Sequence, residues 1–411
     1  MTSQLILMNQ LAVAVASDTL TSRVGQSDTK TWPSHSKIYE LPAPALGVVA
    51  HCGSVALQDA DWRLLVRDWS TSLESLSAPR MVDYVDFFTE WIHKNASTYF
   101  LSDARGVESR LTASLRGGGQ VRYLAGALDS HLRDALRVDP VSFDEDIATA
   151  IRSHITENFS TDSFQGDSEE SMQAVFAASN FDLMAHFRFA CELSDDAIIG
   201  PMTQDALREF AIAALLRPAN WGNNSMALAF AGYGTQENLG HCVILRIYGY
   251  WGGRLRFTAE EGGSSNPGDY PIIVPLAQSS AMESFLYGFN FDVMEVMEEI
   301  LENDLKVLGG LEQEKIDSIT DSVTTKWSTH LRTHFMEPAF ETVGTLGISN
   351  LCKFAEFLIH LQAFRSATDD TEATVGGLIE SVVIAPERGV RWRSRISSEI
   401  HRIESSSHVF E

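Results

Sequence analysis

The chain begins with two short apolar runs on either side of a polar pair, a pattern that restricts this stretch to a β-hairpin. The runs cover residues 5–7 and 11–16, and the polar pair stands at 9–10. Strand-forming side chains that flank a polar turn are typical of two antiparallel strands. An alternating stretch at 36–41 and an apolar run at 46–50 follow. We therefore expect four strands within the first fifty residues.

The second residue, Thr2, is a candidate nucleophile. Removal of Met1 would leave Thr2 with both a hydroxyl and a free α-amine. A hydroxyl needs a nearby base to become a good nucleophile, and an α-amine with a pKa of about 7.7–8.0 is suited to that role. Taken singly, Thr2 could simply permit removal of Met1, Asp18 could bind turn amides, and Lys37 could be a solvated residue at a strand edge. The hypothesis therefore depends on the three residues together.

With Asp18 at the end of the second expected strand and Lys37 at the start of the third, the N-terminal stretch resembles a known family. It is similar to the proteasome β-subunit branch of the N-terminal nucleophile (Ntn) hydrolases, including the bacterial proteasome-like proteins called Anbu. The step of 16 residues from Thr2 to Asp18 matches the family, whereas the step of 19 to Lys37 is slightly longer. Near the other end, Thr374-Val375-Gly376-Gly377 is similar to the Gly-Gly step that precedes the last strand pair of the family.

This resemblance implies a role for each of five residues. Thr2 would attack a carbonyl carbon while its own amine accepts the proton. Lys37 would be a buried cation that lowers the pKa of both groups, and Asp18 would neutralise and orient it. The backbone N–H of Gly53 would bind the oxyanion. Ser279 would replace the serine of a Gly-Ser-Gly motif near the amine, although its flanking glycines are missing here. The resemblance implies neither a cofactor nor a metal.

The same resemblance implies an α+β fold, the four-layer αββα sandwich, and it lapses in a stretch that we interpret as a large helical insertion. We expect the proteasome-like domain at 1–99 and 223–395, a mainly helical insertion at 100–222 and a C-terminal tail at 396–411. Apolar residues at helical spacing predict helices at 59–69, 82–92, 143–158, 171–193, 204–216, 282–289, 291–308, 311–335 and 351–364. Alternating or apolar runs predict further strands at 226–234, 241–248, 253–257, 271–274 and 374–392.

Composition excludes several classes of partner. The formal charge of −24 argues against nucleic acid and anionic membranes. Four cysteines without paired spacing suit a reduced cytosolic protein and predict neither a disulfide framework nor a zinc site. No apolar run is long enough to span a bilayer. We therefore expect a cytoplasmic protein.

The leading hypothesis is a threonine-type Ntn amidohydrolase, with a peptidase (a threonine protease) favoured, acting on a peptide or protein within a homo-oligomer. Oligomerisation is implied by the resemblance alone. One alternative is a catalytically inactive proteasome-like scaffold or assembly subunit. Another is an acylase-type hydrolase of small amides. The sequence leaves open the substrate, any regulatory partner, and whether the insertion gates the site, forms an oligomer contact or recruits a partner.

Overall fold

The computed structural model describes residues 2–395 with several internal gaps. The residues outside the description are 1, 25–28, 34–35, 74–76, 101, 117–123, 129–131, 133–135, 137, 139–141, 220–225, 264–265, 290, 308–311, 369–374 and 396–411. The expected C-terminal tail and Thr374 therefore lie outside the described residues.

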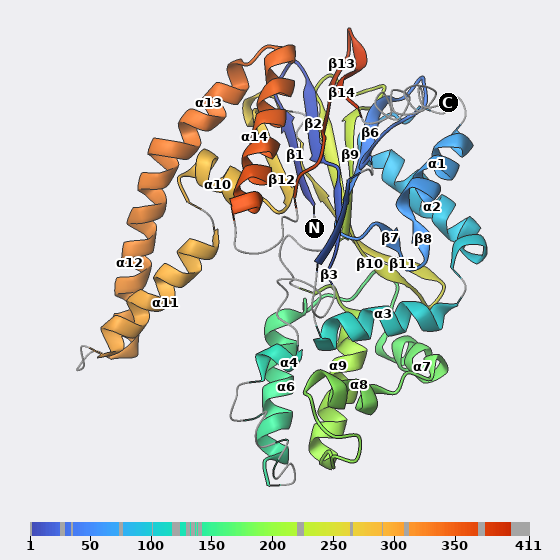
Figure 1. Ribbon diagram of the computed structural model, residues 1–411, viewed down its shortest axis with the longest axis vertical. Helices are drawn as coiled ribbons and strands as arrows, with labels where there is room; N and C mark the ends of the chain where they lie inside the picture. Colours follow the sequence, from blue (N-terminus) through green and yellow to red (C-terminus); the bar gives the residue numbers. More distant parts are fainter. Residues whose placement is uncertain are drawn as a thin grey trace, which may run out of the picture.

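The protein is an α+β protein built on two five-stranded antiparallel sheets (Figure 1). The first sheet has the order β12 (Ile272–Ala277), β1 (Ser3–Met8), β2 (Val13–Asp18), β13 (Ile379–Ala385) and β14 (Gly389–Ser394). The second has the order β11 (Arg254–Glu261), β10 (His241–Trp251), β9 (Met226–Tyr233), β6 (Leu46–Cys52) and β5 (Ile38–Glu40). A small hairpin of β3 (Leu20–Val24) and β4 (Thr29–Pro33) lies between β2 and β5. A second small hairpin, of β7 (Ala56–Leu57) and β8 (Ala60–Asp61), follows β6.

The two sheets share one apolar core. Side chains alternate between the two faces of a strand, so Ile6 and Met8 of β1 point to one side and Leu5 and Leu7 to the other. The first pair packs with residues of the second sheet, such as Val48, in a cluster of buried side chains. The second pair belongs to a separate cluster formed with helices. The first sheet is therefore buried on both faces, which explains why the run at 5–7 is continuously apolar.

Helices cover the outer face of each sheet (Figure 1). The second sheet carries α1 (Trp62–Leu73) and α2 (Met81–Tyr99), as the helical spacing predicted. Edge-to-face packing of Trp69 on Phe88 (5.3 Å between ring centroids) and on Phe230 of β9 (5.7 Å) joins these layers. The first sheet carries α10 (Ser280–Tyr287), α13 (Glu337–Thr345) and α14 (Ile348–Thr368).

Residues 103–216 form a group of helices at one end of the sheets (Figure 1). The helices are α3 (Asp103–Arg116), α4 (Leu124–Ala127), α6 (Asp144–Asn158), α7 (Glu169–Ser179), α8 (Leu183–Ala190) and α9 (Pro201–Leu216). They have their own buried core, which also takes in Trp251 from the end of β10. The indole N–H of Trp251 donates to the carbonyl of Leu215 at 3.2 Å. The single helix expected at 171–193 is wrong, because Asn180 adopts a left-handed conformation that ends α7.

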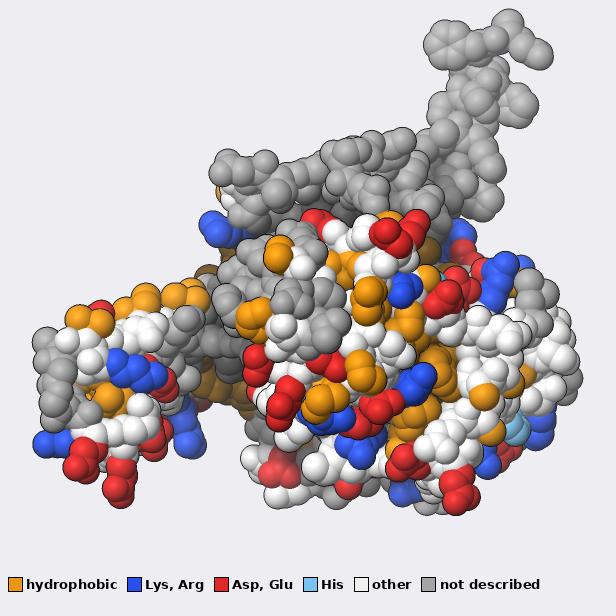
Figure 2. Space-filling model, turned by 90° about the horizontal axis from the view of Figure 1, so that it is seen from below, with side chains coloured by type: hydrophobic (Ala, Val, Ile, Leu, Met, Phe, Trp, Pro, Cys, Tyr) orange, Lys and Arg blue, Asp and Glu red, His pale blue; other side chains and the backbone are white. Residues whose placement is uncertain are grey.

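A helical arm made of α11 (Phe291–Val307) and α12 (Gln313–Leu331) extends away from the body (Figures 1 and 2). A π-helical turn, η2 (Arg332–Met336), connects α12 to α13, and a short 3-10 turn, η1 (Pro267–Asp269), precedes β12. Exposed apolar side chains of the arm include Val293, Val296, Ile300 and Trp327. In the part of the chain that the structure describes, none of the helices is both long and apolar enough to cross a membrane.

Candidate active site

The core between the sheets turns from apolar to polar at one end. Gln4 of β1 pairs in register with Ser17 of β2, which pairs with Glu380 of β13. All three residues are fully buried, at the face that carries Ile6 and Val15 farther along. The Nε2 atom of Gln4 donates to Ser17 Oγ at 3.2 Å and to the carbonyl of His51 at 3.1 Å. Buried polar groups need such partners, so this row marks a polar site between the sheets.

A buried ion pair stands beside this row. The Nζ atom of Lys37 lies 2.7 Å from Oδ1 of Asp18, and the two side chains are 2% and 0% exposed. The Lys37 ammonium also donates to the carbonyl of Leu20 at 2.8 Å. The same Oδ1 atom accepts the backbone N–H of Ser3 at 3.0 Å. One carboxylate oxygen therefore holds the lysine cation against the first residues of β1.

The environment of Asp18 acts on its pKa in two directions. Burial is the larger effect and raises the pKa of the Asp18 carboxyl above its ordinary value, while the Lys37 ammonium and the amides of Ser3 and Gly376 oppose this rise. The amide of Gly376 donates to the second carboxylate oxygen at 3.2 Å. Both oxygens thus have hydrogen-bond donors, which is the condition under which a buried carboxylate can remain paired and charged.

The Gly376-Gly377 step that the sequence singled out packs on the turn after Asp18. The carbonyl of Gly376 accepts the amides of Thr19 at 3.2 Å and Leu20 at 3.0 Å. Gly377 has φ +76°, and a Cβ at this position would lie 2.9 Å from the hydroxyl oxygen of Thr19. A side chain is therefore excluded by both conformation and space.

Thr2 and Ser279 lie in adjacent segments. Thr2 is 3% exposed, and its carbonyl accepts the amide of Gln278 at 2.9 Å. The hydroxyl of Ser3 donates to the carbonyl of Gln278 at 2.8 Å. The hydroxyl of Ser279 instead donates to Oε1 of Glu283, a buried residue of α10, at 2.6 Å. The segment before α10 therefore contacts the start of the chain through Gln278, whereas the Ser279 hydroxyl binds a residue of its own helix.

Gly53 directly follows β6, where the backbone amide of His51 donates to the carbonyl of Lys37 at 2.9 Å. Gly53 has φ +86°, a left-handed conformation that favours glycine. The register of β6, β9 and β10 places Cys52 opposite Ala227 and Met226 opposite Ile247. From Ile247, β10 continues to Trp251, which belongs to the core of the helical insertion. Gly53 and Lys37 therefore lie at the end of the second sheet that faces the insertion.

Sequence reasoning missed Glu380. Its Oε2 atom accepts the backbone N–H of Lys37 at 3.3 Å, across the space between the sheets. One signal was available, because Glu380 is the only charged residue in the otherwise mostly apolar strand Ile379–Ala385. A charge at a core-facing position of such a strand is costly without a partner, and it therefore marks a functional or structural cluster.

Comparison with models of protein families gives no match to this chain, and no curated protein matches it. Among the described residues, no group of three or more histidine, cysteine, aspartate or glutamate side chains is placed to hold a metal ion. The structure brings Lys37, Asp18 and the amide of Ser3, the residue after Thr2, into direct contact. Gly53 lies at the same end of the second sheet as Lys37.

Proposed function

We propose that the protein is a threonine-type N-terminal nucleophile amidohydrolase that acts after removal of Met1. The observation that carries this proposal is the shared oxygen of Asp18, which binds both the Ser3 amide and the Lys37 ammonium. A buried cation is thereby fixed beside the residue that would become the N-terminus. The fold supports the proposal, because two antiparallel sheets with helices on their outer faces are consistent with the αββα sandwich that the resemblance implies.

The first half of the reaction would form an ester on Thr2. Its Oγ atom attacks the carbonyl carbon of an amide, and its α-amine accepts the hydroxyl proton. The Lys37 cation favours the deprotonated forms of both groups, and the Gly53 N–H binds the developing oxyanion. Breakage of the C–N bond releases the amine, which takes its proton from the Thr2 α-ammonium.

The second half would return the free threonine. The α-amine removes a proton from water while the water oxygen attacks the ester carbonyl. The C–Oγ bond then breaks, and Oγ recovers a proton from the α-ammonium. The sum is hydrolysis of an amide to a carboxylic acid and an amine, without any cofactor. A peptide or protein is the proposed substrate, because the helical insertion adds a large surface at the same end of the sheets.

Intact-mass spectrometry of the full-length protein, before and after treatment with a β-lactone, tests this function. We expect a mass that lacks Met1 and one adduct per chain, which a Thr2→Ala variant does not form. Retained Met1 with no adduct would overturn the hydrolase and favour the inactive scaffold. Turnover of small N-acyl amides with none of peptides would favour the acylase-type alternative.

A further inference from the structure

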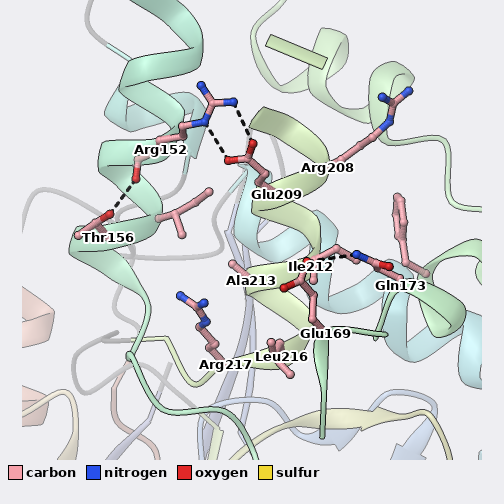
Figure 3. A pocket seen from close by; sticks show the side chains of 12 residues that line it. Arg152, Thr156, Glu169, Gln173, Arg208, Glu209, Ile212, Ala213, Leu216 and Arg217 are labelled. Carbon is pink, nitrogen blue, oxygen red and sulfur yellow. Dashed lines mark hydrogen bonds and ion pairs between the residues drawn. The ribbon is translucent and has the colours of Figure 1, made fainter. Parts of the chain in front are cut away.

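A cleft of about 600 Å³ opens between α6, α7 and α9 in the helical insertion (Figure 3). This volume lies in the range of small-molecule sites, about 300–1,000 Å³. Its lining contains none of the residues around Thr2, so the inference drawn from it does not depend on the proposed hydrolase activity.

The charges in the cleft differ from those of the whole chain. The protein carries a formal charge of −24, yet the lining contains three arginines and only two glutamates. Arg152 forms two hydrogen bonds of 2.9 Å with Glu209 at one end (Figure 3). Arg208 pairs with Asp205 at 2.9 Å. Two of the three cations are therefore already neutralised.

Arg217 is the third cation, and its Nε atom is buried without a hydrogen-bond partner among the described residues. Its backbone is fixed, because its amide donates to Ala213 at 2.9 Å and its carbonyl accepts Nη2 of Arg110 at 3.3 Å. A cation at the C-terminus of α9 is favoured by the helix dipole. The dipole does not provide an acceptor for the buried N–H, and a donor left in this state costs about 1–3 kcal/mol. The Nε atom itself is closed off from solvent, so a ligand in the cleft would meet the Nη groups of the Arg217 guanidinium, which lines the cleft (Figure 3).

The lining also contains a set of apolar side chains. This set consists of Ile155, Phe176, Ile212 and Leu216. Such a surface suits a hydrocarbon chain, whose removal from water contributes about 25 cal/mol per Å². Glu169 also lines the cleft, and its negative charge disfavours a ligand with more than one anionic group.

We propose that this cleft binds a small monoanionic carboxylate with an apolar chain. The carboxylate accepts hydrogen bonds from the Arg217 guanidinium, whose planar geometry matches two carboxylate oxygens. The chain lies along Ile212 and Leu216.

Titration calorimetry of the full-length protein with octanoate tests this site. We expect one octanoate per chain and binding of octanol that is at least about tenfold weaker, because a hydrogen bond to a charged group is worth about 1.5–3 kcal/mol. Arg217→Gln is expected to weaken octanoate binding by the same factor and to leave octanol binding unchanged. Arg208→Gln is the matched control, because Arg208 lines the same cleft but is already paired with Asp205. This variant should bind octanoate within about twofold of the wild type.

Circular dichroism confirms that each variant is folded before it is titrated. Equal affinity of the wild type for octanoate and octanol would overturn the proposal without reference to any variant. Absence of octanoate binding at millimolar concentration, or equal losses in the Arg217 and Arg208 variants, would also overturn it.

Discussion

The ammonium of Lys37 and the carboxylate of Asp18 lie 2.7 Å apart where the two sheets meet, and both side chains are shielded from solvent. Three backbone groups complete their hydrogen bonds: the carbonyl of Leu20 and the amides of Ser3 and Gly376. Removal of either partner would leave the other charge buried without a counterion. Such a change should therefore affect the stability of the protein as well as any reaction at Thr2.

A double-mutant cycle should reveal this coupling. We expect Lys37→Met and Asp18→Asn each to lower the free energy of unfolding by about 3–5 kcal/mol, because each leaves a buried group without its partner. The double variant should lose clearly less than the sum, since neither charge is then left alone. Urea unfolding at pH 7 measures all four proteins. Additive losses would mean that the pair contributes no coupling.

The reactivity of Thr2 should depend on its hydroxyl and not on its shape. Thr2→Ser keeps the oxygen, whereas Thr2→Val keeps the branched outline and loses the nucleophile. We expect the β-lactone to label the serine variant within about tenfold of the wild-type rate and not to label the valine variant. The rate of adduct formation by mass spectrometry is the measurement. Labelling of the valine variant would assign the reaction to another side chain.

Glu380 should stabilise the fold by holding the amide of Lys37. We expect Glu380→Leu to lower the free energy of unfolding by about 1–3 kcal/mol, because it leaves a buried N–H without an acceptor. Glu380→Gln retains a carbonyl oxygen at the same position and should lose less. Urea unfolding compares the two variants, with Glu387→Leu at an exposed position of the turn after β13 as the control. Equal losses in the leucine and glutamine variants would show that the hydrogen bond to Lys37 is not what matters.

Local signals were sufficient for much of the fold. The apolar runs before Asp18 and the Gly376-Gly377 step predicted strands and a turn that are present as β1, β2 and the start of β13. The resemblance carried by Thr2, Asp18 and Lys37 also implied that Asp18 and Lys37 pair, and the structure brings their side chains into contact. The strand signals lie in short stretches whose own residues favour the extended conformation.

Contacts between distant segments were not accessible in this way. Glu380 meets Lys37 from a strand more than three hundred residues away, and only the register of β2 with β13 brings them together. The cleft at Arg217 depends on three helices whose relative positions follow from side-chain packing. The break at Asn180 was missed because an apolar pattern continued across it and a single left-handed residue gives only a weak sequence signal.

Gly232 should resist substitution because β6 runs close to it. Gly232 has φ +151°, and a Cβ there would meet the carbonyl of Leu46 and lie 2.6 Å from the Cα atom of Gly47. We expect Gly232→Ala to lower the free energy of unfolding by about 1–3 kcal/mol, since the two strands must separate to admit the methyl group. Gly347→Ala is the matched control, because no atom lies within 4 Å of its added Cβ. Thermal unfolding should leave the control close to the wild type, and equal shifts in both variants would contradict this explanation.

The helical insertion should lose stability in mild acid through His154. Burial lowers the pKa of this imidazole below its ordinary 6.5, an effect that Glu157 partly opposes. As the pH falls below about 6.5, the unfolded chain binds a proton at this histidine more readily than the folded chain, so the free energy of unfolding decreases, by at most about 1.4 kcal/mol per pH unit. His154→Gln removes the titrating group and should flatten this dependence between pH 7.5 and 5.5, whereas the exposed His360→Gln should leave it unchanged. Urea unfolding at each pH measures the slopes, and the same slope in the wild type and the His154 variant would rule out this histidine as the source.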